Sequence, residues 1–171
     1  MNAALLPLLV LLAGHAPCSG PEQMQKKAPN APEPASVQVS MVTIAPKEIR
    51  LGQGPDRATV TVQVWHQLTP EGQAQTADLE VGDFSTNPPK GVGATYTPSI
   101  QRVTLSGPPG VVIETVEVSK PSCPTGVSTC ALVIWASLAN PSAGLRILRP
   151  DPATNAQATL TIHNQQPGQG H

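Results

Sequence analysis

Apolar and polar residues alternate over short stretches that are separated by turn residues. The clearest stretch is 58–66, where Val60, Val62 and Val64 fall on one face and threonine or glutamine lies between them. Residues 156–164 alternate in the same way. A period of two is the signature of a β-strand with one face in a core. Both stretches are therefore predicted to be strands.

Two further stretches depart from simple alternation in informative ways. Residues 130–138 are apolar on both faces, which predicts a central strand that is buried on both sides. Residues 37–44 begin to alternate and then shift phase at Ile44. A phase shift indicates a β-bulge or a strand that passes from one sheet to another.

Weaker strand patterns and turn-rich segments fill the rest of the chain. Four short stretches are predicted strands: 49–51, 77–81, 100–105 and 111–119. The turn at 106–110 is expected to join its two neighbours as a hairpin, and 111–119 is expected to form the next hairpin with 130–138. Residues 139–148 fit neither period and are interpreted as a loop with one short strand.

These elements predict the fold class. Many short strands with Pro- and Gly-rich turns and no helical stretch are typical of an all-β, two-layer antiparallel sandwich of about 7–9 short strands. A barrel is the alternative architecture. In the sandwich, one set of aliphatic residues is expected to face inward together: Val60, Val62, Val64, Leu132, Ile134, Leu160 and Ile162.

The order of these patterns resembles an immunoglobulin-like or fibronectin-III-like sandwich domain of an exported bacterial protein. The resemblance runs from the bulged first strand to the strand at 156–164 and covers residues 36–164. It is one of architecture. Immunoglobulin domains join their two sheets by a disulfide packed against a Trp, whereas Cys123 and Cys130 are close enough in sequence to close a single loop.

Composition supports one domain with appendages. The chain has 171 residues, 20 of them Pro and 14 Gly, which fits many turns. Its formal net charge of -1 provides no basic surface for nucleic acid or for an anionic membrane.

The first segment is typical of a signal peptide, predicted at 1–20. An apolar run from Leu5 to Leu12 is followed by small residues, and it is too short for a membrane span, which takes about 20 residues. A Pro-rich linker is predicted at 21–35 and a disordered tail at 165–171. The protein is therefore expected to be exported, and to be periplasmic, secreted or at the cell surface.

The three cysteines have separate interpretations. Cys123 and Cys130 are predicted to form a disulfide, since an isolated pair in an exported chain is normally oxidised. Cys18 has two alternatives. It is either lipidated, as in bacterial lipoproteins, and serves as a lipid anchor, or it is lost with the signal or left near the mature start. His15 and Pro17 depart from the lipoprotein pattern.

No catalytic constellation is present in the sequence. It lacks a glycine-rich phosphate loop before a helix and a G-x-S-x-G nucleophile elbow, so neither an enzyme nor a cofactor is expected. Asp78, Glu80 and Asp83 form an acidic cluster in which Asp78 and Glu80 share a strand face and could hold Ca²⁺. A solvated outer face is the preferred interpretation, so no metal is predicted. His66 and His163 are expected to lie at solvated strand ends.

The candidate binding surface rests on rare aromatic residues. Phe84 and Tyr96 are the only Phe and Tyr and lie in the segment 82–99, which is expected to be a long loop. They either form a binding surface or, as is more common, cover an open end of the core. Trp65 is the third candidate, and it is either exposed or packed under a loop. The leading hypothesis is a non-enzymatic module with a structural, adhesive or partner-binding role toward a protein or glycan partner. The alternative is a carbohydrate- or small-ligand-binding sandwich that uses these aromatic residues.

Overall fold

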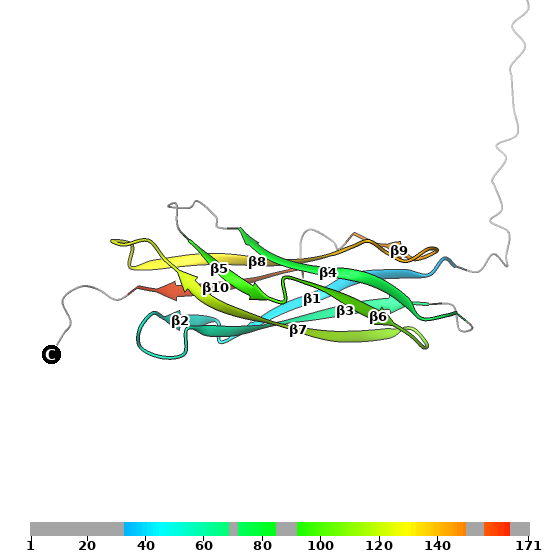
Figure 1. Ribbon diagram of the computed structural model, residues 1–171, viewed down its shortest axis with the longest axis horizontal. Helices are drawn as coiled ribbons and strands as arrows, with labels where there is room; N and C mark the ends of the chain where they lie inside the picture. The colour runs from blue at the N-terminus through cyan, green and yellow to red at the C-terminus, as the bar shows by residue number, and fades with distance from the viewer. Residues whose placement is uncertain (1–32, 69–71, 85–91, 150–155, 165–171) are drawn as a thin grey trace, which may run out of the picture. The chain divides into compact units, whose positions relative to one another are not determined.

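In the part of the chain that the structure describes, ten β-strands form two five-stranded sheets that enclose one hydrophobic core (Figure 1). The computed structural model describes residues 33–68, 72–84, 92–149 and 156–164. Within these ranges there is no helix, and hence none long and apolar enough to cross a bilayer. The predicted all-β, two-layer sandwich is confirmed, with ten strands in these ranges where about 7–9 were expected.

Each sheet has a simple neighbour order. Sheet A has the order β5-β7-β3-β1-β9, with bounds Gly93–Thr97, Gly110–Ser122, Arg57–Gln67, Ser36–Ala45 and Arg146–Ile147. Sheet B has the order β2-β10-β8-β4-β6, with bounds Glu48–Arg50, Gln157–His163, Thr129–Ala139, Gln75–Phe84 and Ile100–Leu105. Neighbours are antiparallel except the short pairs β1–β9 and β2–β10, which are parallel.

Consecutive strands always lie in opposite sheets, because the odd-numbered strands form sheet A and the even-numbered strands form sheet B. Both predicted hairpins are therefore wrong. β6 pairs with β4 rather than with β7, and β7 pairs with β3 and β5 rather than with β8. Alternation within a strand specifies which residues face inward, but it carries no information about which strand lies alongside.

The strand order is that of an immunoglobulin-like sandwich. β1, β3, β7 and β5 take the places of strands A, B, E and D in one sheet, and β4, β8 and β10 take those of C, F and G in the other. β2, β6 and β9 are additional edge strands. The predicted resemblance in architecture is thus present in the topology.

Two strands pass from one sheet to the other at a two-residue corner. β1 continues into β2 through Pro46 and Lys47, and β5 continues into β6 through Pro98 and Ser99. The Ala45–Pro46 and Thr97–Pro98 bonds at these corners are both cis. The first strand both bulges and changes sheets, the two alternatives that its phase shift indicated. The register shift lies between Val39 and Met41 rather than at the predicted Ile44, so Met41 faces outward.

The core is filled by alternate side chains from both sheets. All the residues predicted to face inward are fully buried: Val60, Val62, Val64, Leu132, Ile134, Leu160 and Ile162. β8 is the central strand of sheet B, as predicted, but its second face is not buried. Ala131 is exposed and Val133 is half-buried, because a two-layer sandwich leaves the outer face of each sheet to solvent.

The predicted disulfide between Cys123 and Cys130 is present. It lies where the chain crosses from β7 in sheet A to β8 in sheet B, so it closes this crossover and not the hairpin loop expected from the sequence. Inside the loop, the Val127 amide donates to the Pro124 carbonyl at 3.1 Å. The loop between β8 and β10 contains one short strand, β9, as predicted.

Several sequence predictions fall outside the described residues. These are the signal peptide at 1–20, Cys18, nearly all of the linker at 21–35, and the tail at 165–171. The last linker residue, Ala35, is described, and its carbonyl accepts a hydrogen bond from the Arg146 amide at 2.9 Å. The expected domain start at Ser36 coincides with the first residue of β1.

The predicted orientation of the buried side chains can be tested by two substitutions within one strand. Leu160 of β10 is fully buried, whereas its neighbour Thr159 is exposed. Leu160→Ala is expected to lower the free energy of unfolding by about 2–5 kcal/mol because it leaves a cavity. Thr159→Ala should cost less than about 0.5 kcal/mol. Denaturant melts of the two variants measure both values, and equal losses would show that the strand faces the other way.

Candidate functional site

An aromatic pair lies on the outer face of sheet B. In the register of β4 with β8, Gly82 lies opposite Trp135 and Phe84 lies opposite Val133. Phe84 and Trp135 are therefore diagonal neighbours on the same face, a separation that long aromatic side chains can span. Phe84 is 43% exposed. We call Gly82, Phe84, Val133 and Trp135 the aromatic face.

Gly82 provides the space in which the Trp135 indole lies. A Cβ atom built on Gly82 would come within 2.7 Å of Trp135 Cζ2 and 3.0 Å of Cε2. Atoms this close would overlap, so any other residue at this position must displace the ring. The nitrogen side of the indole thus lies directly over the backbone of Gly82, and the half-buried Trp135 is held against the sheet.

Polar side chains border the aromatic face. On the β10 side, Gln157 lies opposite Trp135 and Thr159 lies opposite Val133, and both are exposed. On the β6 side, Ile100 lies opposite Glu80 and is 60% exposed. An apolar aromatic centre with hydrogen-bonding groups around it suits a ligand that has both a flat apolar surface and polar groups.

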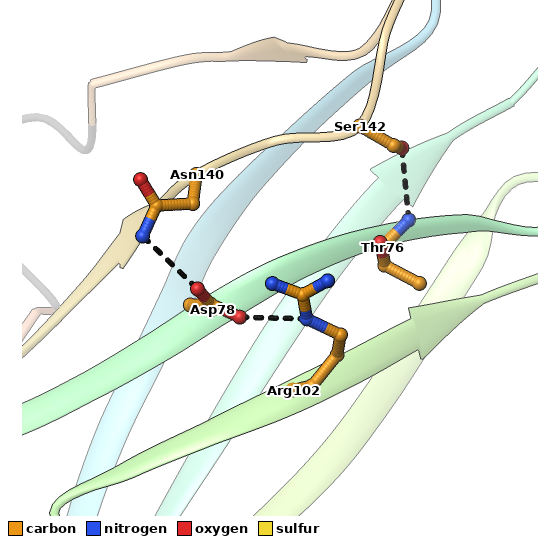
Figure 2. Close-up of polar contacts among 5 residues, drawn as sticks. All are labelled: Thr76, Asp78, Arg102, Asn140 and Ser142. Atoms are coloured by element: carbon orange, nitrogen blue, oxygen red, sulfur yellow. Dashed lines mark hydrogen bonds and ion pairs between the residues drawn. The ribbon is translucent and has the colours of Figure 1, made fainter.

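A polar cluster lies further along the same face, where Asp78 accepts two hydrogen bonds. Figure 2 shows Asp78 of β4 between Arg102 of β6 and Asn140, the first residue after β8. Arg102 Nε donates to Asp78 Oδ1 at 2.8 Å, and Asn140 Nδ2 donates to Asp78 Oδ2 at 3.0 Å. These contacts, that with Arg102 first, lower the pKa of Asp78 below its ordinary value. The carboxylate is thus already occupied by protein donors.

The chain after β8 is also hydrogen-bonded to β4 beside this polar cluster. The Thr76 amide donates to Ser142 Oγ at 3.0 Å (Figure 2). In return, the Ser142 amide donates to the Thr76 carbonyl at 2.8 Å. Asn140 has a positive φ of 45°, which turns the chain toward β4. Together with Asp78, these contacts tie three segments of sheet B into one structural unit. We assign this cluster a positioning role.

The described residues contain no group of three or more His, Cys, Asp or Glu side chains that could hold a metal ion. Asp78 and Glu80 share the outer face of β4, as the sequence predicted. Asp83 has the opposite phase and lies across from the inward Ile134. The three acidic residues of this strand are therefore not gathered at one point.

The three aromatic residues predicted to form a binding surface lie at three different places. Phe84 is the last residue of β4 and faces outward from sheet B, and Trp65 of β3 lies on the outer face of sheet A beside Val111. Tyr96 of β5 packs against the core between the sheets. Much of the segment 82–99, expected to be a loop, is strand. The partner of Phe84 is Trp135, which sequence reasoning had placed on a buried face.

Tyr96 has a buried hydroxyl. Its oxygen is enclosed and makes no hydrogen bond of normal geometry with the described residues, although the carboxylate of Asp83 lies nearby. Burial, and after it the nearby carboxylate of Asp83, raises the pKa of Tyr96 well above its ordinary value. The tyrosine therefore stays neutral and acts as a packing residue at this end of the core.

His66 corrects another prediction. It was expected at a solvated strand end, but it is only 3% exposed. Its position continues the inward phase of Val60, Val62 and Val64, so its ring enters the core. Burial lowers its pKa, which favours the neutral ring. His163 is half-buried, with Nε2 lying 3.4 Å from a carboxylate oxygen of Glu48.

Comparison with known proteins gives only distant likenesses. No family model matches the sequence, and no curated protein matches it. The chain is similar to the apo-form Calx CBD1 domain, with 18% identity, a TM-score of 0.33, and coverage of 76% of this chain and 98% of that chain. It is also similar to CBD12 from CALX1.2, with 18% identity, a TM-score of 0.36 and coverage of 75% and 45%. The calcium binding domain CBD12 of CALX1.1 has 19% identity, a TM-score of 0.31 and coverage of 72% and 45%.

The contact between Gly82 and Trp135 can be tested by adding one methyl group. Gly82→Ala should displace the indole into solvent, shift its fluorescence to longer wavelength, and cost on the order of 1 kcal/mol. In a Trp135→Ala background the same change should be harmless, because the obstacle is gone. Gly93→Ala is the matched control, since a Cβ there meets nothing within 4 Å. An unchanged emission spectrum in Gly82→Ala would contradict the contact.

The lowered pKa of Asp78 predicts a pH-dependent contribution to stability. Since the folded pKa lies below the ordinary value of 3.8, the contribution is complete above about pH 4 and disappears as the pH falls through the folded pKa. Asp78→Asn should therefore melt at a lower temperature than the wild type at pH 7, and this difference in melting temperature should become smaller in acid. In a protein that already carries Arg102→Gln and Asn140→Ala, adding Asp78→Asn should change the melting temperature little at any pH. A difference that is constant from pH 7 to pH 2 would contradict this role.

Proposed function

We propose that this chain is a non-catalytic binding module that works outside the cytoplasm, in the periplasm, at the cell surface or after secretion. The Cys123–Cys130 disulfide supports an oxidising compartment. The apolar run followed by small residues at the N-terminus supports export. A lipid on Cys18 would keep the module at a membrane surface, and its loss with the signal would release it.

The aromatic face on sheet B is the observation that carries the proposed binding role. The outer faces of a sandwich are normally polar, yet Trp135, Phe84 and Val133 lie together here, with Ile100 exposed nearby. Aromatic residues dominate the energetic centres of protein interfaces. Gly82 strengthens the argument, because it keeps the indole against the sheet as a preformed surface. We propose that a partner protein docks on this face.

The partner is sought by cross-linking in intact source cells. A photoreactive amino acid at Phe84 should give one discrete cross-linked species. The same group at Thr43, which is exposed on sheet A, should not. With the identified partner purified, Trp135→Ala should weaken binding about tenfold or more, the equivalent of about 1.4 kcal/mol or more. Failure to cross-link at Phe84, or full affinity in Trp135→Ala, would overturn the proposal.

A glycan is the second candidate ligand, and the position of Trp135 favours it. An indole held against the sheet can stack on the apolar face of a sugar ring, while Gln157 and Thr159 beside it can hydrogen-bond to hydroxyl groups. Of the three aromatic residues expected from the sequence, Phe84 alone contributes to this surface. Titration of the purified protein with a panel of glycans tests this candidate. A glycan ligand would change the tryptophan fluorescence of the wild type but not that of Trp135→Ala.

A further inference from the structure

A carboxylate lies beside the aromatic face on sheet B. Glu80 precedes Gly82 by two residues on β4, so it points outward from the sheet, as Gly82 and Phe84 do. In the register of β4 with β8, Gly82 lies opposite Trp135. Glu80 and Phe84 are therefore both diagonal neighbours of Trp135, and long side chains at diagonal positions can reach each other. The indole is thus flanked along β4 by an aromatic ring and by a carboxylate.

The Glu80 side chain has no partner in the described part of the fold. It forms no hydrogen bond or ion pair with any other described residue. Its neighbours across the sheet are Ser137 of β8 and Ile100 of β6, and neither carries a charge. Glu80 is half-buried, so part of the water that would solvate its carboxylate is excluded. A cation from outside the chain would therefore be favourable at this position.

The cation closest to Glu80 in the register of sheet B is already engaged. Arg102 of β6 shares the outer face with Ile100, the residue opposite Glu80. Figure 2 shows Arg102 beside Asp78, and its Nε donates to Asp78 Oδ1 at 2.8 Å. This hydrogen bond raises the pKa of Arg102 above its ordinary value. The charge of Arg102 is thus matched by Asp78, which leaves Glu80 uncompensated beside the aromatic face.

An indole with a carboxylate beside it suits a planar organic cation. Cations are attracted to the face of an aromatic ring, and to tryptophan most strongly. The guanidinium of arginine can stack on such a ring while its N–H groups donate to a carboxylate. The ammonium of lysine is compact and more strongly hydrated, so it gains less from stacking. The combination of Trp135 with Glu80 therefore favours arginine.

We infer that a partner protein holds the aromatic face by an arginine side chain, whose guanidinium stacks on Trp135 and donates to Glu80. The inference rests on the proposed function, because it names the group that anchors the docked partner. Phe84, on the other side of Trp135 along β4, would contact the aliphatic part of that side chain. The charge of Glu80 also separates this ligand from a glycan, since a neutral sugar would stack on Trp135 without needing it.

Two small probes test the cation site without the partner. N-acetyl-arginine amide and its citrulline counterpart have nearly the same shape, but only the arginine probe is charged. The chain has two Trp residues, so in a Trp65→Phe background the tryptophan emission comes from Trp135 alone. The arginine probe should bind about fivefold more tightly than the citrulline probe, and Glu80→Gln should remove this difference. Equal responses to the two probes before Glu80 is changed would overturn the inference.

A second carboxylate variant is the matched control for net charge. Glu117→Gln removes one carboxylate from β7 in sheet A, far from the aromatic face in the topology, and should leave the preference for the arginine probe unchanged. Glu80→Gln should keep the melting temperature of its parent, because its carboxylate has no partner in the described fold. An equal loss of the preference in Glu117→Gln would reveal a general charge effect and would contradict the inference.

The partner identified by cross-linking at Phe84 gives the independent measurement. The cross-linked region of the partner should contain an arginine, and replacing it with Gln should weaken binding about tenfold. Adding Glu80→Gln should then weaken binding little further, because the two groups act as one pair. Fully additive losses would overturn the arginine anchor and leave the docking proposal intact. Absence of any cross-link at Phe84 would instead overturn the docking proposal.

Discussion

The face-to-face packing of the two sheets is the constraint on which the rest of the structure depends. Each described strand is followed by a strand in the opposite sheet, so every connection passes from one sheet to the other. Strands that lie side by side are thus distant in sequence, and a local turn cannot define their register. The register is set by the buried side chains, since a shift of one residue would turn an entire apolar row to solvent. Val60, Val62 and Val64, fully buried in β3, are such a row.

This constraint also determines how much the sequence could predict. Alternation located most of the strands and the inward residues, because these depend only on which side of the chain meets the core. It also indicated a phase shift in β1, but placed it at Ile44 instead of between Val39 and Met41. It could not identify strand neighbours, and the expected pairing of 100–105 with 111–119 was wrong for that reason. It also gave β8 two buried faces. Val133 and Trp135 are apolar, but the outer face of β8 would be buried only if a third layer packed on it.

The candidate site was partly accessible by the same reasoning. Phe84 was singled out as a rare aromatic residue, but its neighbour depends on the pairing of β4 with β8. The role of Gly82 was not predictable, since it follows from the position of one indole ring. The two remaining candidates, Trp65 and Tyr96, were expected beside Phe84 because no local pattern distinguishes sheet A from sheet B. The topology separates them, with Trp65 on the outer face of one sheet and Tyr96 against the core.

The passage of the chain from β5 in sheet A to β6 in sheet B determines which strand edges are covered. Together the two strands behave as one rim strand that covers half of β7 and then half of β4. Among the described residues, the stretches without a rim neighbour are 110–116 of β7 and 82–84 of β4, and the latter ends in the aromatic face at Phe84. Gln101 on β6 and Glu114 on β7 close the gap between the sheets where the rim has changed layers. A rim strand that stayed in one sheet would cover one of these edges completely. The crossing that fills the core from both layers therefore also leaves two separate edges without a strand neighbour among the described residues.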